Sequence, residues 1–214
     1  MVKKFDVNLL PSAPDFSFEM ELWESGLALV AGVDEAGRGA LAGPVAAAAL
    51  IFPSDPSLAA ELHGVRDSKQ MTPGQRDEWA QRLPEIALAC GVAFASPGEI
   101  DELGIVPSTR LAMQRALDLL ETAPEYLLID YVELPERPIP QKALVKGDAR
   151  SLSIAAASIL AKTARDTCLR DLARVYPGYG FASNKGYGTE AHREALARLG
   201  PCKVHRRKFQ GCKG

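Results

Sequence analysis

Short apolar runs alternate with longer amphipathic stretches along this chain. Residues 27–33 (LALVAGV) and 45–52 (VAAAALIF) are apolar runs that flank a glycine-containing segment. Their length and the intervening glycines predict two buried, antiparallel strands. Residues 91–95 and 126–129 are further short apolar runs that predict strands, and residues 142–145 predict a weaker one. We expect these runs to form the sheet of the protein.

Helical stretches lie between and after these runs, at residues 73–89, 108–122, 151–174 and 189–198. Pro73 stands where proline is tolerated at a helix start, and Pro84 is expected to interrupt that helix or end it early. Ser108 and Thr109 are candidate caps of the second helix. The third is rich in alanine and serine, which would let it approach a sheet closely, although the helix propensity of alanine explains the same composition. Strands interleaved with helices favour a mixed α/β fold built in layers.

Acidic residues stand where the predicted strands end. Asp34 and Glu35 follow the first apolar run, Asp130 closes residues 126–129, and Asp148 lies just before the longest helix. Strand ends are the usual ligand sites of open α/β sheets. Carboxylates gathered there would repel one another unless a cation neutralised them, and Mg²⁺ prefers oxygen ligands. Two such ions can activate a water and stabilise the leaving oxygen of a phosphodiester.

The neighbouring positions of Asp34 and Glu35 raise a geometric problem, because adjacent residues of a regular strand point to opposite faces. The two carboxylates can converge only if the strand breaks at or just after Glu35. Gly37 and Gly39 could supply that break, and their N–H groups could bind a sugar-phosphate. A glycine-rich acidic turn on the surface would show the same pattern, so this stretch alone leaves both interpretations open.

Composition and charge narrow the class of protein. The chain has 214 residues, of which 47% are hydrophobic and 24% charged, as in a soluble globular protein of one domain. No secretory signal is visible and the longest apolar run is far too short to span a bilayer, so we expect a cytoplasmic protein. Residues 185–214 hold eight Lys or Arg and two Glu, a balance of +6, which leaves −8 for the rest of a chain whose net charge is −2. This asymmetry suggests a polyanionic partner, although a solvated basic tail would have the same composition.

The four cysteines favour a reducing compartment, because they form no CxxC pair and no disulfide-framework spacing. Cys202, His205 and Cys212 could be imagined as zinc ligands. Their spacing matches no common zinc module, so structural or incidental cysteines are the better interpretation.

Several blocks of the sequence together resemble one family. "GVDEAGRGALAGPV" at residues 32–45 is similar to the opening motif of ribonuclease HII, the type 2 ribonuclease H family. Further blocks agree in the same order: DSK at 67–69, LLID at 127–130, KGDARSLSIAAASILAKTARD at 146–166, YGFASNKGYGTEAH at 179–192 and VHRRKF at 204–209. The resemblance covers nearly the whole chain from about Leu27. The 26 residues before it are too few for the extra N-terminal domain of ribonuclease HIII.

The resemblance implies an α/β fold of the ribonuclease H-like type, in which helices flank a central mixed β-sheet and a helical appendage follows. Residues 1–26 would be an N-terminal extension, partly disordered, and residues 27–214 a single catalytic domain. The basic segment at about 185–214 would belong to that domain. We expect a monomer that binds RNA–DNA hybrids and ribonucleotide-containing duplex DNA, and no membrane.

The resemblance also assigns the site. Asp34, Glu35, Asp130 and Asp148 would be the catalytic, metal-binding carboxylates and would hold Mg²⁺ or Mn²⁺. Asp166 is a rival for the fourth place, because it lies in the same strongly patterned stretch. The fourth acid of the family precedes the long helix, which favours Asp148, and Asp166 is more simply interpreted as part of an ion-pair network.

Substrate contacts are implied for five further residues. The triplet of Gly37, Arg38 and Gly39 would recognise the ribonucleotide at an RNA–DNA junction, where a 2′-hydroxyl distinguishes RNA from DNA. Tyr187 would pack on the neighbouring deoxyribose, and Lys69 would bind backbone phosphate together with the basic C-terminal segment. The implied activity hydrolyses the RNA strand of hybrids and nicks 5′ of ribonucleotides embedded in DNA, which leaves a 3′-hydroxyl and a 5′-phosphate.

This chain departs from the family pattern at a few positions. Tyr131 and Val132 follow the third acid where glycine and asparagine are usual, Ala40 replaces a frequent proline, and Lys208 stands where serine is common. None of them is a proposed metal ligand, and the first departure bears on the shape of the loop after Asp130. Two alternative functions stay open, a different metal nuclease on the same fold, such as a Holliday-junction resolvase, and a non-catalytic protein that binds hybrids.

Overall fold

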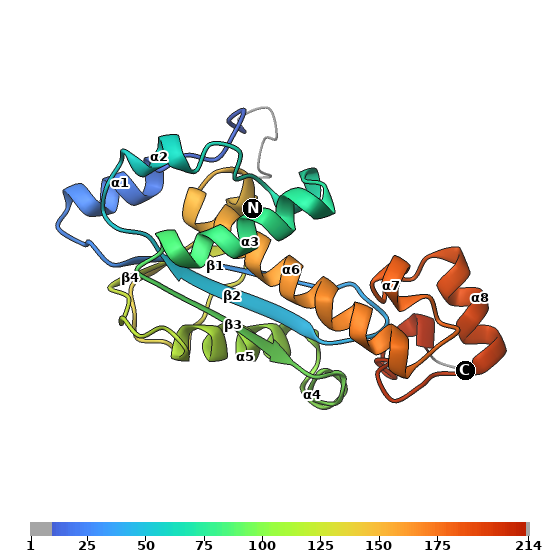
Figure 1. The fold of residues 1–214 in the computed structure, drawn as a ribbon. Helices are drawn as coiled ribbons and strands as arrows, with labels where there is room; N and C mark the ends of the chain where they lie inside the picture. The colour runs from blue at the N-terminus through green and yellow to red at the C-terminus, as the bar shows by residue number, and fades with distance from the viewer. Residues whose placement is uncertain (1–9, 213–214) are drawn as a thin grey trace.

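The computed structural model describes residues 10–212, and its centre is a five-stranded mixed sheet (Figure 1). The strand order is β3-β2-β1-β4-β5. The strands are β1 (Val30–Ala36), β2 (Val45–Ile51), β3 (Ala89–Ala95), β4 (Tyr126–Asp130) and β5 (Gln141–Leu144). β2 runs antiparallel to β1 and β3, whereas β4 runs parallel to β1 and β5. The predicted antiparallel pair and the mixed sheet are therefore confirmed.

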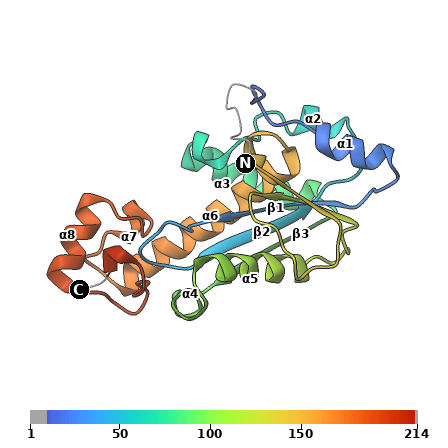
Figure 2. The ribbon, with the colours of Figure 1, turned by 180° about the vertical axis from the view of Figure 1, so that it is seen from behind.

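Helices cover both faces of the sheet. α6 (Leu152–Val175) lies along one face together with α3 (Pro73–Ile86), and α5 (Ile105–Asp118) lies on the other face with α4 (Pro97–Leu103) beside it (Figures 1 and 2). Alternate residues of β2 enter two separate cores. Ala48 and Leu50 pack under α6 and α3, whereas Ala47 and Ala49 pack under α5. The period of two in a strand thus explains why a strand of seven apolar residues is buried along its whole length.

The small residues of α6 do allow a close approach to the sheet. A Cβ atom on Gly32 of β1 would lie only 2.2 Å from the backbone carbonyl carbon of Ser153, so this position requires glycine. The N-cap of α6 is Ser151, whose hydroxyl accepts a hydrogen bond from Ile154 N at 3.2 Å. A buried acid from another helix reinforces this start, because Glu19 accepts from Ser151 Oγ at 2.6 Å and from Ser153 N at 3.0 Å.

Several helix limits differ from the sequence expectation. Pro84 lies in the last turn of α3 without interrupting it, and α3 ends at Ile86, three residues before the predicted end. α5 begins at Ile105 rather than at residue 108, so Ser108 and Thr109 are buried inside the helix and do not cap it. Thr109 instead donates its hydroxyl to Ile105 O at 2.8 Å. α4 was not predicted from the sequence, although Ser96 and Glu99 form a capping box at its start.

The remaining elements extend the molecule at both ends of α6. α7 (Phe181–Asn184) and α8 (Glu190–Leu199) form the helical C-terminal appendage beyond the end of α6 (Figure 1). α1 (Ser17–Glu24) and α2 (Leu58–Glu61) lie near the other end, and the 3-10 helices are η2 (Ser68–Gln70), η3 (Gly147–Ala149) and η4 (Gln210–Cys212). Residues 1–9 of the expected N-terminal extension lie outside the described residues. Within residues 10–212, no helix has the length and apolar character needed to cross a membrane.

Candidate metal centre and its pocket

Two neighbouring parallel strands bring three of the predicted carboxylates together. β1 and β4 pair in a register that sets Val33 beside Ile129, and the next residue of each strand is an aspartate, Asp34 and Asp130. One carboxylate oxygen from each of Asp34, Glu35 and Asp130 lies within 4.8 Å of the others. The sheet edge at which β4 ends therefore carries a cluster of three acids, as the sequence predicts.

Glu35 joins this cluster although it is still part of a regular strand. It pairs with Ala47 of β2, and Ala36 pairs with Ala46, so the strand continues one residue past Glu35. The break follows at Gly37, whose φ is +94°. β4 stops at Asp130, which leaves the β4 side of β1 without a paired strand beside Glu35. The strand thus ends just after Glu35 and the chain turns at Gly37, which agrees with the expected break.

Asp148 lies at the side of this cluster. It belongs to η3 and is buried, and its Oδ2 accepts a hydrogen bond from Lys69 Nζ at 3.2 Å. Among the described residues, Asp148 is not part of the group whose oxygens converge within 4.8 Å. It is nonetheless close enough for its charge to raise the pKa of Asp34 and Asp130, after the larger effect of burial. Burial lowers the pKa of Lys69, but Asp148 and Asp67 outweigh this effect and raise it above the ordinary value.

The three converging carboxyl groups are unfavourably placed for negative charge. Burial is the largest cause that raises the pKa of Asp34, Glu35 and Asp130. The charges of neighbouring acids add to it, since Glu35, Asp130 and Asp148 raise the pKa of Asp34, Asp130 raises that of Glu35, and Asp148 raises that of Asp130. Arg38 opposes this for Glu35, because Nη1 of Arg38 lies 3.2 Å from Oε1. The second oxygen of Glu35, Oε2, is buried and makes no hydrogen bond with any described residue. A divalent cation would remove the repulsion and supply the missing partner, so the residues fit a metal.

A cavity of about 550 Å³ opens over the cluster, and we call it the acidic pocket. Its lining residues are Asp34, Glu35, Ala36, Gly37, Arg38, Gly39, Ser68, Lys69, Arg76, Asp130, Ser158, Lys162 and Tyr187. All the predicted site residues except Asp148 thus line one cavity. Cations stand around the acids, as suits a site in which a metal ion lies between the carboxylates and an anionic substrate.

The fold requires glycine at one of the two glycine positions of the triplet and not at the other. Gly37 has a positive φ, and a Cβ there would lie 1.8 Å from Nε of Arg165, so both the backbone and the packing require glycine. A Cβ on Gly39 would meet no atom within 4 Å, and its φ is an ordinary one. The fold thus gives no reason for glycine at position 39. The open space beside it lies in the acidic pocket, where a ligand could approach the backbone closely.

Two buried arginines hold the loop that carries the triplet. Arg165 donates to the carbonyl oxygens of Pro44 at 2.9 Å, Ala42 at 3.1 Å and Lys185 at 2.9 Å. The loop from β1 to β2 is thereby tied to the turn that precedes Tyr187. The guanidinium of Arg165 also lies 5.3 Å from the ring centroid of Tyr187, and this ring remains partly exposed.

Arg206 completes this support, because it donates to Gly37 O and Arg38 O, both at 2.8 Å, and to Gly43 O at 3.0 Å. Burial, and then the charge of Arg165, lowers its pKa to about 9. By its position in the sequence, Arg206 belongs to the basic segment that was expected to bind phosphate. That interpretation was wrong for this residue, whose donors all point into the protein. Both arginines lie in the blocks that carry the family resemblance, but arginine is so rarely buried that only the fold reveals their role.

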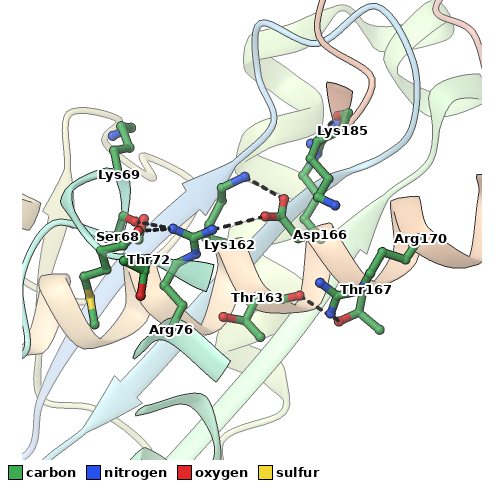
Figure 3. Close-up of polar contacts among 12 residues, drawn as sticks. Ser68, Lys69, Thr72, Arg76, Lys162, Thr163, Asp166, Thr167, Arg170 and Lys185 are labelled. Atoms are coloured by element: carbon green, nitrogen blue, oxygen red, sulfur yellow. Dashed lines mark hydrogen bonds and ion pairs between the residues drawn. The ribbon is translucent and has the colours of Figure 1, made fainter. Parts of the chain in front are cut away.

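Asp166 lies outside the cluster and forms the ion-pair network that the sequence analysis favoured for it. Its carboxylate is buried, Lys162 Nζ lies 2.5 Å from Oδ1, and Arg76 Nη2 lies 3.6 Å from Oδ2 (Figure 3). Arg76 comes from α3 and the other two residues come from α6. Asp166 is therefore already neutralised by two cations, which makes it a poor metal ligand.

Two other sequence expectations have clear outcomes. Tyr131, which stands where the family usually has glycine, adopts a left-handed conformation with φ +62°, the region that glycine favours. Its exposed ring lies 5.7 Å from the guanidinium carbon of Arg38. Cys202, His205 and Cys212 form no metal-binding group within residues 10–212. His205 instead lies between Cys202 N at 3.0 Å and Nε2 of His192 at 3.1 Å.

Comparison with known proteins gives a consistent result. Residues 31–212 match the family described as "Ribonuclease HII". The chain is 54% identical to the ribonuclease HII of Synechococcus sp. (strain JA-3-3Ab) over 92% of this chain and 88% of the relative. It is 52% identical to that of Moorella thermoacetica (strain ATCC 39073 / JCM 9320), over 91% of this chain and 93% of the relative.

Solved structures agree with the sequence relatives. The ribonuclease H2 from Pyrococcus horikoshii OT3 is similar with a TM-score of 0.71 and 29% identity, over 86% of this chain and 94% of that chain. The ribonuclease HII of Archaeoglobus fulgidus, solved in complex with PCNA, has a TM-score of 0.67 and 28% identity, over 84% and 93% of the two chains. These similarities confirm the expected ribonuclease H-like fold.

Proposed function

This chain belongs to the ribonuclease HII family, and we propose that its acidic pocket is the active site for the activity of that family. The protein is a metal-dependent endoribonuclease that hydrolyses the RNA strand of RNA–DNA hybrids. It nicks 5′ of ribonucleotides embedded in duplex DNA and leaves a 3′-hydroxyl and a 5′-phosphate. The observation that supports this site is the convergence of one buried and two partly buried carboxylates in one cavity with the glycine-arginine-glycine triplet.

The carboxylates of Asp34, Glu35 and Asp130 would hold Mg²⁺ or Mn²⁺, with Glu35 Oε2 as an otherwise unpartnered ligand atom. When bound, such ions activate a water and stabilise charge on the phosphate in hydrolysis. A protein of the same fold, Bst-RNase HIII, has been solved in complex with Mn²⁺, with a TM-score of 0.66 and 20% identity. Asp148 would either be the fourth metal ligand or hold Lys69 in place. Its hydrogen bond with Lys69 favours the second of these roles.

The triplet and Tyr187 would distinguish a ribonucleotide from a deoxyribonucleotide. The backbone at Gly37 and Gly39 would contact the 2′-hydroxyl, because the missing Cβ at position 39 leaves room for a sugar. Arg165 and Arg206 would fix this loop in the required shape through their hydrogen bonds to its carbonyls. The partly exposed ring of Tyr187 would pack against the next deoxyribose.

Lys69 would contact a backbone phosphate near the carboxylates. Its side chain is 75% exposed although it reaches Asp148, so it can approach a ligand without losing much packing. The bound lysine would also shield Asp148 from the negative phosphate.

The remaining expectations concern the cellular context. We infer a cytoplasmic protein that acts as a monomer in the removal of ribonucleotides from DNA. The inferred division of the chain places an N-terminal extension at residues 1–26 and one catalytic domain at residues 27–214. The family match over residues 31–212 is compatible with that division.

A duplex that contains a single ribonucleotide tests this function. With Mg²⁺, we expect one nick at the phosphate 5′ of the ribonucleotide, and excess EDTA should abolish it. Equal cutting of an all-DNA junction would favour a different metal nuclease, and binding without any cutting would favour a non-catalytic hybrid-binding protein.

A further inference from the structure

A second cavity, of about 370 Å³, lies beside the acidic pocket between α3, α6 and α7, and we call it the basic pocket. Its lining residues are Pro73, Arg76, Asp77, Lys162, Thr163, Asp166, Arg170, Ala182, Ser183 and Lys185. Arg76 and Lys162 line both cavities, so they form a shared wall (Figure 3). A ligand that lies over the acidic pocket and extends across this wall would reach the basic pocket.

The basic pocket has an excess of positive charge. Four cations and two acids line it, and one of the acids, Asp166, is already paired with Arg76 and Lys162. Arg76 is further occupied by the carbonyls of Ser68 at 2.9 Å and Met71 at 2.6 Å. The cations of the shared wall are thus largely neutralised within the protein.

The other two cations, Arg170 and Lys185, form no ion pair with any carboxylate of residues 10–212. Arg170 Nη2 donates to Thr167 Oγ1 at 2.8 Å, and Lys185 Nζ donates to Ala182 O. Burial lowers the pKa of Lys185. The charges of Arg170 and Arg76 lower it further, against the opposing effects of Asp166 and Asp77. These two side chains are thus near other cations, and neither forms an ion pair with the acids of the pocket, Asp166 and Asp77. Figure 3 shows both of them beside Asp166, on the far side from Arg76.

A buried hydroxyl in the same lining also lacks a partner. A threonine inside a helix commonly donates its hydroxyl to the carbonyl four residues earlier. Thr109 does so to Ile105 O at 2.8 Å, and Thr167 does so to Thr163 O at 3.0 Å. Thr163 is the exception, because its Oγ1 is buried and makes no hydrogen bond with the described residues. A ligand with acceptor oxygens would satisfy it.

We propose that the basic pocket binds a backbone phosphate of the nucleic-acid strand that is cut in the acidic pocket. The inference rests on the proposed function, and it assigns a second phosphate site on the side of the cut where Tyr187 lies. Lys185 precedes Tyr187 by two residues in the same turn, so one turn would position both the sugar and the next phosphate contact. A guanidinium, an amine and a hydroxyl together match the oxygens of a phosphodiester.

Arg170→Gln is the primary test, because Arg170 is partly exposed and donates to a side chain, Thr167 Oγ1. Its loss leaves intact the hydrogen bonds that Arg165 and Arg206 donate to backbone carbonyls. On the single-ribonucleotide duplex, KM should rise about tenfold with an unchanged kcat, as for the loss of a charged hydrogen bond. The slope of log KM against log salt should fall by about 1, because one phosphate contact is lost. Arg170→Lys should restore most of the affinity, and Lys185→Gln should behave like Arg170→Gln.

Arg174→Gln is the matched control. Arg174 lies one turn later on α6, its side chain is 83% exposed, and it lines neither pocket. This variant removes the same charge from the same helix, and its KM and salt slope should stay within about twofold of the wild-type values. A similar loss in Arg174→Gln and Arg170→Gln would show a general effect of net charge and would overturn the proposed site.

Neutral methylphosphonate linkages placed one at a time along the cut strand locate the contact. For the wild type, we expect one linkage on the Tyr187 side of the cut to raise KM about tenfold. The same linkage should have little further effect on Arg170→Gln, because its partner is already missing. Additive effects at every position would overturn the basic pocket while wild-type cleavage stayed normal. Failure of the wild type to cut the unmodified duplex would instead overturn the proposed function.

Discussion

The acidic and basic pockets share a wall, but the first holds carboxylates that need a cation and the second holds cations that need an anion. In the acidic pocket, burial and the repulsion of neighbouring acids raise the pKa of Asp34, Glu35 and Asp130, and Glu35 Oε2 lacks a hydrogen bond with the described residues. In the basic pocket, Arg170 and Lys185 form no ion pair with any described carboxylate, and Thr163 Oγ1 lacks a hydrogen bond within the described residues. In the wall itself, Asp166 is paired with Arg76 and Lys162. The charged side chains that stabilise the fold thus form ion pairs with one another. The carboxylates and cations without such pairs indicate where a metal ion and a phosphate would bind.

The largest expected effect is that of Asp130→Asn on cleavage. Asparagine keeps the Oδ1 acceptor for Gly147 N, which lies at 2.7 Å, but it removes the charge that would hold a metal. We expect kcat to fall by about three orders of magnitude, while affinity for the duplex changes little. Single-turnover cleavage and a binding assay on the same duplex measure the two quantities. A variant that cuts at a tenth of the wild-type rate would show that Asp130 is dispensable for the metal.

Asp166→Asn tests the shared wall. The substitution leaves the partly buried cations Arg76 and Lys162 without their buried acid, and such a loss costs about 3 kcal/mol of unfolding free energy. Urea denaturation of the metal-free protein measures it. Asp171→Asn is the matched control, because Asp171 forms an exposed pair with Arg174 on the same helix and its loss should cost under about 0.5 kcal/mol. Equal costs for the two variants would contradict the distinction between wall and surface.

The two glycines of the triplet should separate stability from substrate binding. Gly37→Ala forces a side chain into a positive φ and against the tightly bonded Arg165, so the free energy of unfolding should fall by at least about 2 kcal/mol. Gly39→Ala should change it by less than about 0.5 kcal/mol but should raise KM severalfold, because the methyl group fills space meant for the sugar. Thermal unfolding measures the change in stability, and steady-state kinetics measures the change in KM. An unchanged KM in Gly39→Ala would remove the argument for a close approach at that position.

The smallest expected effect is on the pH dependence of stability without metal. Because the pKa values of Asp34, Glu35 and Asp130 are raised, proton uptake stabilises the folded state, and this contribution is lost as pH rises through those values. His205 acts oppositely, since its pKa is lowered to about 4 by burial and by His192, so its contribution is lost as pH falls below about 6.5.

The wild type and Asp130→Asn both contain His205, so its contribution cancels in the difference between their melting temperatures. Metal-free Asp130→Asn should melt about 2–4 °C above the wild type at pH 8, and the gap should narrow towards pH 5. A gap that is constant across this range would show that the cluster does not titrate as described.

Local patterns predicted much of the fold, and three of the four carboxylates that they singled out converge in the structure. The apolar runs located β1, β2 and β4, and the acids that follow such runs meet because parallel neighbours end at one edge. The pattern could not reveal Arg206, whose hydrogen bonds to Gly37 and Arg38 join residues more than 160 positions apart. Nor could it place Asp148 beside Lys69, since that contact depends on how η2 and η3 pack.

Calorimetric titration with Mn²⁺ tests the central claim most directly, because it needs neither substrate nor catalysis. We expect the wild type to bind Mn²⁺ and Asp130→Asn to bind it at least about tenfold more weakly. Asp166→Asn, compared at a temperature where it is folded, should bind like the wild type. Wild-type protein that takes up no Mn²⁺, or an affinity lost equally in both variants, would contradict a metal site built from Asp34, Glu35 and Asp130.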